Sequence, residues 1–293
     1  MESGLATAEF TKQGFSVRSN GQCLAIAALV LAIGFAAAPA FADDASALRP
    51  LCTDRPTKST APCTVDVGHI QIESDLFNFT VDHSGGGDVK TYLVTNPTIK
   101  YGLTANLDAE INMTPYAVVT SRDPGTGVTN RTSGVGDLFV RLKWNLLGNA
   151  GGNVGLALSP YVKLPTASGG IGNGAAEGGL IAPVNINLPA NWSVTFDPEI
   201  DLQKNAGDRG RHINTSGLIS LSRGVSKALT LSVELWADQN FDPQGEQTQV
   251  SADLGAAFIP AKAPNLQFDG GVNFGLNRNT PGTQVYVGVS RRF

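Results

Sequence analysis

The sequence predicts an all-β protein, an antiparallel up-and-down transmembrane β-barrel of about 12 strands. Three observations predict it: apolar and polar residues alternate after residue 65, no helix-length apolar run follows residue 42, and short and longer connections alternate. Successive side chains of a strand lie on opposite faces, so alternation indicates strands with one apolar and one polar face. Short turns at one end and longer loops at the other are the layout of outer-membrane barrels.

Residues 1–42 have the features of a secretory signal peptide, so we exclude them from the fold. Lys12 and Arg18 precede an apolar run over 24–38, and the sequence Ala-Phe-Ala at 40–42 supplies a cleavage site. The run is shorter than the roughly 20 apolar residues of a transmembrane helix. We therefore expect an exported protein.

Residues 43–65 form a periplasmic N-terminal segment that is rich in proline and lacks periodicity. Cys23 leaves with the signal peptide, so Cys52 and Cys63 remain as an even pair in an exported chain. A disulfide between them is expected, with two free thiols as the alternative. The adjacent Asp54 and Arg55 belong to a segment that either folds into the barrel as a small plug, with Arg55 facing acidic residues, or caps the periplasmic mouth.

Residues 66–293 form the predicted barrel. Its twelve strand-like runs cover 66–81, 88–101, 107–120, 134–147, 153–164, 177–188, 192–204, 211–223, 229–241, 247–259, 265–276 and 283–293. Five short turns connect them at 102–106, 148–152, 189–191, 224–228 and 260–264, whereas 121–133 and 165–176 are the notable longer loops. An even strand number places both ends of the barrel on the short-turn side, in the periplasm.

Each run is justified by its alternation, which is clearest in the second half. In the run 192–204 the residues Trp192, Val194 and Phe196 oppose Thr195 and Asp197. The first run changes phase at its phenylalanines, which predicts a β-bulge. Proline is unfavourable inside a strand, and the runs contain Pro97, Pro115, Pro160, Pro183 and Pro198.

The apolar face is expected to point outward into lipid. Side chains just fill a barrel of about eight strands, so a twelve-stranded lumen is too wide to pack dry. Aromatic residues of the apolar face gather beside the short turns as one interfacial girdle; they are Tyr101, Trp144, Trp192, Phe258, Phe268 and Phe293. A soluble β-sandwich is the alternative fold.

The polar face then lines an enclosed lumen with charged and aromatic side chains. The predicted lumen-lining residues are Glu73, Lys100, Asp108, Glu110, Tyr116, Asp137, Arg141, Lys143, Tyr161, Lys163, Asp197, Glu199, Asp201, Glu234, Trp236, Asp253, Asp269 and Tyr286. The bases gather on the early strands and the last one, whereas acids dominate strands seven to eleven. Opposed charges of this kind create a transverse field across a lumen, with internal salt bridges and water as the alternative reading.

Six short motifs are characteristic of this chain: TDRPTKS at 53–59, PCTV at 62–65, GHIQIE at 68–73, YGLTANL at 101–107, GVGD at 134–137 and RLK at 141–143. Together they resemble the MetA-pathway family of phenol degradation. The resemblance covers most of the chain after the signal peptide. It implies a β-barrel in the bacterial outer membrane, often described as a transporter, and it implies no catalytic residues.

The function expected from these features is passive uptake of small solutes, with aromatic or hydrophobic compounds as candidates. The expected partners are outer-membrane lipid, the small-molecule solute, and the barrel-assembly machinery through the C-terminal strand that ends at Phe293. A net charge of −4 argues against nucleic acid. We expect no cofactor and no metal, because the histidines after residue 42 are only His69, His83 and His212.

Two alternatives remain open. A lipid or ester hydrolase would need a nucleophile, a base and an orienting group within reach of one another, and His212, Asn214 and Ser216 share one face of a strand. However, residues four apart on a strand are separated by about 13 Å, so we expect no enzyme. A closed structural barrel without a conducting lumen is the other alternative.

Overall fold

The computed structural model describes residues 48–83, 87–207 and 209–293. In this part of the chain, seventeen strand segments form one sheet, and the single helical element is the 3-10 turn η1 (Pro189–Asn191). No helix among these residues is long and apolar enough to cross a membrane. The signal peptide expected at 1–42 lies outside the described residues.

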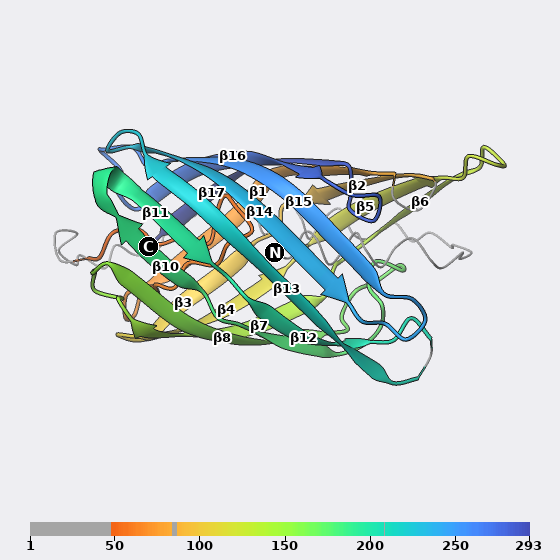
Figure 1. Cartoon of the computed structure of the whole chain (residues 1–293), viewed down its shortest axis with the longest axis horizontal. Coiled ribbons are helices and arrows are strands. Elements are labelled where there is room, and N and C mark those ends of the chain that lie inside the picture. The colour runs from red at the N-terminus through yellow and green to blue at the C-terminus, as the bar shows by residue number, and fades with distance from the viewer. Residues whose placement is uncertain (1–47, 84–86, 208) are drawn as a thin grey trace.

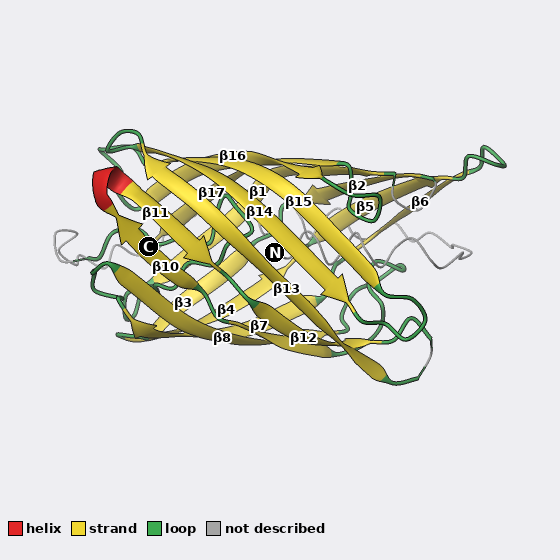
Figure 2. Cartoon of the chain, viewed as in Figure 1, coloured by secondary structure: helices red, strands yellow, loops and turns green. Residues whose placement is uncertain are grey.

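The strand segments combine into the twelve strands of an antiparallel barrel. They are β1 (Ile70–Asp82), β2 (Asp88–Val94), β3 (Thr98–Thr104), β4 (Leu107–Met113), β5 (Tyr116–Arg122), β6 (Thr129–Gly134), β7 (Leu138–Leu147), β8 (Val154–Leu164), β9 (Glu177–Ile181), β10 (Val184–Leu188), β11 (Trp192–Phe196), β12 (Glu199–Lys204), β13 (Arg211–Gly224), β14 (Leu229–Asn240), β15 (Gln247–Phe258), β16 (Leu266–Gly275) and β17 (Thr283–Arg292). The pairs β2–β3, β4–β5, β6–β7, β9–β10 and β11–β12 each make one barrel strand, because both members pair with the same neighbours. The all-β, twelve-stranded prediction is confirmed (Figures 1 and 2).

The first and last strands close the barrel. β1 pairs with β17 in an antiparallel register that runs from Gln71 opposite Arg292 to Val81 opposite Thr283. The backbone N–H of Phe293 donates to the Ile70 carbonyl at 2.8 Å, so both ends of the barrel meet at one rim. The register shifts between Asp75 and Phe77, which confirms the bulge expected in the first strand.

Most of the prolines inside the predicted strands lie where a barrel strand is interrupted. Pro97, Pro115, Pro183 and Pro198 each lie between two segments of one barrel strand, whereas Pro160 lies within β8. A proline has no N–H to donate to the ladder, so the pairing pauses at these positions. Backbone groups at the breaks still connect adjacent barrel strands; for example, the N–H of Ala182 donates to the Pro198 carbonyl at 2.9 Å.

The predicted long loop at 121–133 is wrong. β5 continues to Arg122 and β6 begins at Thr129, so a hairpin with Ser121 opposite Asn130 replaces most of that loop. The residues of β6 are polar on both faces and mostly exposed. A strand that extends beyond the membrane needs no apolar face, and therefore shows no alternation to find.

The apolar and polar faces are inverted relative to a soluble protein. Along β14, Val233 and Leu235 are 48% and 49% exposed, whereas Glu234 and Trp236 are only 2% and 8% exposed. The same arrangement recurs around the barrel, with exposed leucine, isoleucine and valine outside and buried carboxylates, amides and lysines inside. An apolar outer surface over closed, fully paired strands is the solution that a bilayer demands.

We expect Val233→Arg to destabilise the folded barrel in lipid by about 2–4 kcal/mol, because Val233 lies midway along the outer face of β14. Urea unfolding in lipid vesicles measures the free energy. The exposed Asn130 lies on the extended hairpin, so Asn130→Arg serves as the control with little expected effect. Equal destabilisation by both substitutions would contradict the membrane placement.

Candidate functional site: the barrel lumen

The structure buries almost every side chain that the sequence assigned to the lumen. These are Glu73, Lys100, Asp108, Glu110, Arg141, Lys143, Tyr161, Lys163, Asp197, Glu199, Asp201, Glu234, Trp236, Asp253, Asp269 and Tyr286. The carboxylate of Asp137 is buried as well. Tyr116 requires a correction, because the buried residues of β5 are Ala117 and Val119. The break at Pro115 shifts the alternation by one residue and turns Tyr116 to the opposite face.

The chain before β1 lies inside the barrel. We call residues 48–65 the N-terminal segment; it is the orange stretch within the strands of Figure 1. Its polar groups bond to inward-facing side chains from strands on all sides, among them Glu73 on β1, Lys143 on β7 and Asp253 on β15. The segment therefore spans the lumen rather than resting on the rim.

Asp54 anchors one side of the segment by two lysines. Its carboxylate lies 2.6 Å from the Lys100 ammonium and 2.8 Å from that of Lys143. The lysines also reach the wall, since Lys100 lies 2.6 Å from Glu73 and Lys143 lies 2.9 Å from Glu110. Burial alone raises the pKa of the Asp54 carboxyl, but Lys100 and Lys143 outweigh it and hold the pKa well below its ordinary value.

This lowered pKa sets the pH dependence of docking. The free energy of docking should be more favourable for the wild-type segment than for the Asp54→Asn variant. This difference should be constant from about pH 7 to about pH 5 and should shrink below about pH 4. The docked segment has the lower Asp54 pKa, so the charged carboxylate stabilises docking at any pH above the ordinary pKa of aspartate. This stabilisation falls as the pH drops and the carboxylate of the free segment is protonated. Hydrogen exchange of the Thr60 amide, which donates to Asp197 at 2.6 Å, measures docking. A difference that grew towards acid pH would contradict this sign.

Arg55 anchors the opposite side between two acids. Its guanidinium lies 2.6 Å from Asp75 on β1 and 2.9 Å from Asp269 on β16. Gly288 on β17 lies between these acids in the register, and a Cβ there would collide with the guanidinium. Burial alone lowers the pKa of Arg55, but Asp75 and Asp269 raise it above its ordinary value. Arg55 therefore remains charged in its slot.

Lys58 makes a third ionic anchor that the sequence reading missed. Its ammonium lies 2.6 Å from Asp253 and 2.8 Å from the Ser251 hydroxyl. It also lies 5.2 Å from the centroid of the Trp236 ring, within the range of a cation–π interaction. The backbone N–H of Lys58 donates to Glu234 at 3.1 Å. One lysine thus uses acid, hydroxyl and aromatic groups of the wall together.

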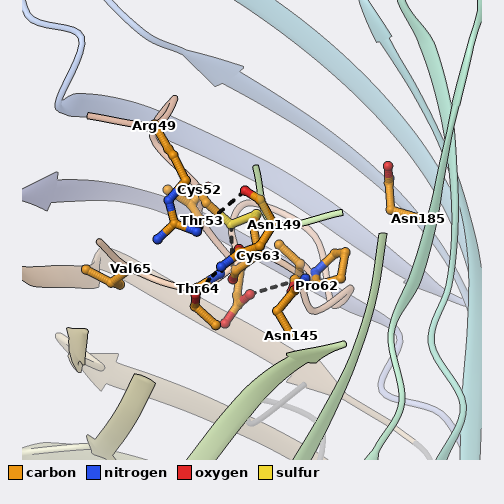
Figure 3. Close-up of a disulfide and its surroundings, with 12 residues drawn as sticks. Arg49, Cys52, Thr53, Pro62, Cys63, Thr64, Val65, Asn145, Asn149 and Asn185 are labelled. Atoms are coloured by element: carbon orange, nitrogen blue, oxygen red, sulfur yellow. Dashed lines mark hydrogen bonds between the residues drawn. A yellow bond between two sulfur atoms is a disulfide. The ribbon is translucent and has the colours of Figure 1, made fainter. Parts of the chain in front are cut away.

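A disulfide fixes the shape of the segment. Cys52 and Cys63 are joined with their Cα atoms 6.2 Å apart, which confirms the expected pairing. Figure 3 shows the bridge beside two amides of the β7 barrel strand and the turn after it: Asn145 donates to the Pro62 carbonyl at 2.7 Å, and Asn149 accepts from the Thr64 N–H at 2.9 Å. The loop between the cysteines carries Asp54, Arg55 and Lys58, so one bridge holds all three anchors.

Glycines of the wall make room for the segment. A Cβ on Gly255 would lie 2.9 Å from Cγ of Pro56, and one on Gly155 would lie 2.8 Å from Cγ of Pro62. Such distances are shorter than real Cβ contacts, so any other residue would displace the segment. Glycine at an inward position of a strand is a sequence signal for the close approach of a second chain segment, a signal that the sequence reading missed.

A loop narrows the opposite end of the lumen. Ile171, in the connection 165–176, is 7% exposed and packs with the buried Leu93, Ala117 and Val119. The N–H of Ala167 donates to Asp137 at 2.8 Å and ties the loop to the wall. The apolar side chain of Ile171 therefore lies in a buried apolar patch inside the mouth.

The residues of the hydrolase alternative have separate partners. Ser216 donates to Glu199 at 3.1 Å, whereas Nδ1 of His212 lies 3.0 Å from Oδ1 of Asn205. Asn214 donates to Asp201 and Asp238. The structure therefore brings neither His212 nor Asn214 to the Ser216 hydroxyl. Among the described residues, no group of three or more histidines, cysteines and acids is arranged to hold a metal ion.

Comparisons with known proteins agree with this architecture. A family model described as "Putative MetA-pathway of phenol degradation" matches residues 53–293. The chain is similar to the solved COG4313 outer membrane channel from Pseudomonas putida F1, with 16% identity, a TM-score of 0.61, and coverage of 78% of this chain and 97% of that chain. It is also similar to the NanC porin, with 8% identity, a TM-score of 0.50, and coverage of 76% and 98%. At these identities the likeness shows a shared barrel fold. A search of the curated proteins finds no match.

Proposed function

Because the chain belongs to the family described as "Putative MetA-pathway of phenol degradation", we propose that it is a passive channel for small solutes across the bacterial outer membrane. Aromatic or hydrophobic compounds are the candidate solutes, in keeping with the family description. The observation that carries the proposal is a polar, charge-lined lumen enclosed by a wall whose outer face is apolar. On this proposal the lumen acts through its electrostatic field rather than through catalysis.

We also propose that the N-terminal segment is a plug that must move for solutes to pass. It is held to the wall by ion pairs of Asp54, Arg55 and Lys58. The cavity beside it has a volume of about 90 Å³, which is smaller than the roughly 150 Å³ of a protein cavity that admits benzene. A solute of several heavy atoms needs more space than this.

The proposed surroundings follow from the two surfaces of the barrel. The exposed apolar side chains would contact outer-membrane lipid. The C-terminal strand would be presented to the barrel-assembly machinery before closure, with Phe293 as its last aromatic residue. In the closed barrel the Phe293 ring lies 4.8 Å from the Arg291 guanidinium carbon.

Liposome swelling tests the proposed channel. Vesicles that contain the protein should swell in sugars, amino acids or aromatic acids faster than protein-free vesicles, and removal of the N-terminal segment should increase the rate. If vesicles with the segment-deleted barrel also fail to swell and carry no current, the closed structural barrel would replace the channel. Ester or phospholipid turnover that Ser216→Ala abolishes would instead establish the hydrolase.

A further inference from the structure

Three carboxylates from β12 and β14 lie on either side of β13 on the lumen face, on the loop side of the plug. Glu199 lies opposite Ser216, which lies opposite Asp238, and in the next row Asp201 lies opposite Asn214. Adjacent strands are about 4.8 Å apart, so the acids share one patch of wall. Asn214 joins them directly, because its amide donates to Asp238 at 2.7 Å and to Asp201 at 3.3 Å. We call Glu199, Asp201 and Asp238 the carboxylate cluster.

No lysine or arginine of the described chain forms an ion pair with the carboxylate cluster. The nearby cations have other partners: Arg141 lies 3.2 Å from Glu110 and Lys163 lies 2.6 Å from Glu177. The Lys204 ammonium donates to the Asn173 carbonyl at 3.5 Å. His212, two residues from Asn214 on β13, lies against Asn205. The plug brings Lys58 to Asp253, not to this cluster. A buried carboxylate ordinarily pairs with a cation or binds a proton, and this cluster has no protein cation beside it.

The Asn214 oxygen gives an independent indication of a ligand that donates hydrogen bonds. Asn214 is 3% exposed, and its Nδ2 donates to both Asp201 and Asp238. Its Oδ1 has no hydrogen-bond partner. The oxygen shares a carbon with that nitrogen, so it lies beside the same acids. Carboxylate and amide oxygens accept hydrogen bonds, and a buried acceptor ordinarily finds a donor. The site therefore offers acceptors to a ligand that must supply the donors.

An aromatic residue contacts the cluster, and two more lie on neighbouring positions of the wall. The Tyr161 hydroxyl donates to Asp201 at 2.8 Å across Gly179, which has no side chain to block it. The Phe139 ring lies 6.1 Å from the Tyr161 ring. On β14, Trp236 is two residues from Asp238 on the same face of the strand. Acids beside aromatic rings are the surroundings in which the ammonium of Lys58 already lies.

Resting on the proposed channel function, we propose that the carboxylate cluster binds the ammonium group of an organic cationic solute in the lumen. An ammonium supplies three hydrogen-bond donors and one positive charge, and a neighbouring aromatic ring adds a cation–π contact. Asp238 is only half-buried, so it is open to a solute that arrives from the loop side. A bare metal ion fits less well, because the described residues present no metal-binding arrangement of acids and histidines.

Calorimetry on the full-length protein in detergent tests this site with two probes of similar size and opposite charge. Phenethylamine, which is an ammonium at neutral pH, should bind more tightly than 3-phenylpropionate. Asp238→Asn and Glu199→Gln should each weaken phenethylamine about tenfold, as the loss of a charged hydrogen-bond partner predicts. Glu246→Gln removes the same charge from an exposed loop residue and should leave the affinity unchanged. Thermal unfolding of each variant shows that it is folded.

The outcomes separate this site from channel function. Equal binding of the two probes, or unchanged affinity in both folded cluster variants, would overturn the ammonium site even if liposomes swell. Selective phenethylamine binding that the cluster variants lose would support the site even if no solute crosses the vesicles, in which case the channel proposal alone fails.

Discussion

Deletion of residues 43–65 is expected to raise the single-channel conductance of the barrel severalfold in planar bilayers. The N-terminal segment crosses the lumen, and the cavity beside it has a volume of about 90 Å³. Ions must pass through what the segment leaves open, so removing it widens the narrowest part of the path. The wall retains some ion pairs without the segment, because Lys100 also pairs with Glu73 and Lys143 also pairs with Glu110.

A second variant distinguishes plug removal from damage to the barrel. Gly288→Val retains every residue of the segment but places a side chain where the Arg55 guanidinium lies, and valine suits a strand position. It should raise conductance in the same direction as the deletion. As a matched control, Gly125→Val changes an exposed loop glycine whose backbone is not in the left-handed region. Unchanged conductance in both the deletion and Gly288→Val would remove the plug proposal.

Arg55→Ala is expected to weaken docking of the N-terminal segment by about 3–5 kcal/mol, because it leaves two buried carboxylates without their cation. The side chains of Asp75 and Asp269 are 3% and 0% exposed, so water compensates little of the loss. The effect should appear in the segment first, because no strand of the barrel depends on Arg55 for backbone pairing. Local release should therefore precede global unfolding.

Hydrogen exchange of the Lys58 and Thr60 amides measures this docking energy, since both donate to wall carboxylates. Arg49→Ala is the matched control on the same segment. Arg49 pairs with Asp66 at the rim, where its side chain is 22% exposed, and a partly exposed pair contributes about 0–1 kcal/mol. Equal protection losses for the two variants would show that Arg55 is not a principal anchor.

The barrel could be predicted from the sequence because a membrane imposes a strict period of two on each strand. Glu234 and Trp236 inside, with Val233 and Leu235 outside, follow directly from that alternation. Prediction failed where the period is absent or interrupted. β6 is polar on both faces, and Tyr116 follows a proline that shifts the phase of its strand. Alternation within a strand contains no information about such shifts.

The contacts of the lumen were harder to predict than its lining. Arg55 could be expected to meet acids, because the wall opposite a disulfide loop is rich in them. Its particular partners, Asp75 and Asp269, depend on the closure of β1 onto β17, which places the two acids on either side of Gly288. Lys58 gave no signal of its own, since a single lysine between Thr57 and Ser59 is typical of any solvated segment.

The short connection between Cys63 and β1 limits how far the disulfide loop can travel. Residues 64–69 connect this loop covalently to β1 of the wall. Six residues extend to at most about 20 Å. A released loop would therefore stay close to its binding site on the wall, at a high effective concentration. Opening would then be brief and self-reversing, with each pore resealing by an intramolecular step that needs no second molecule.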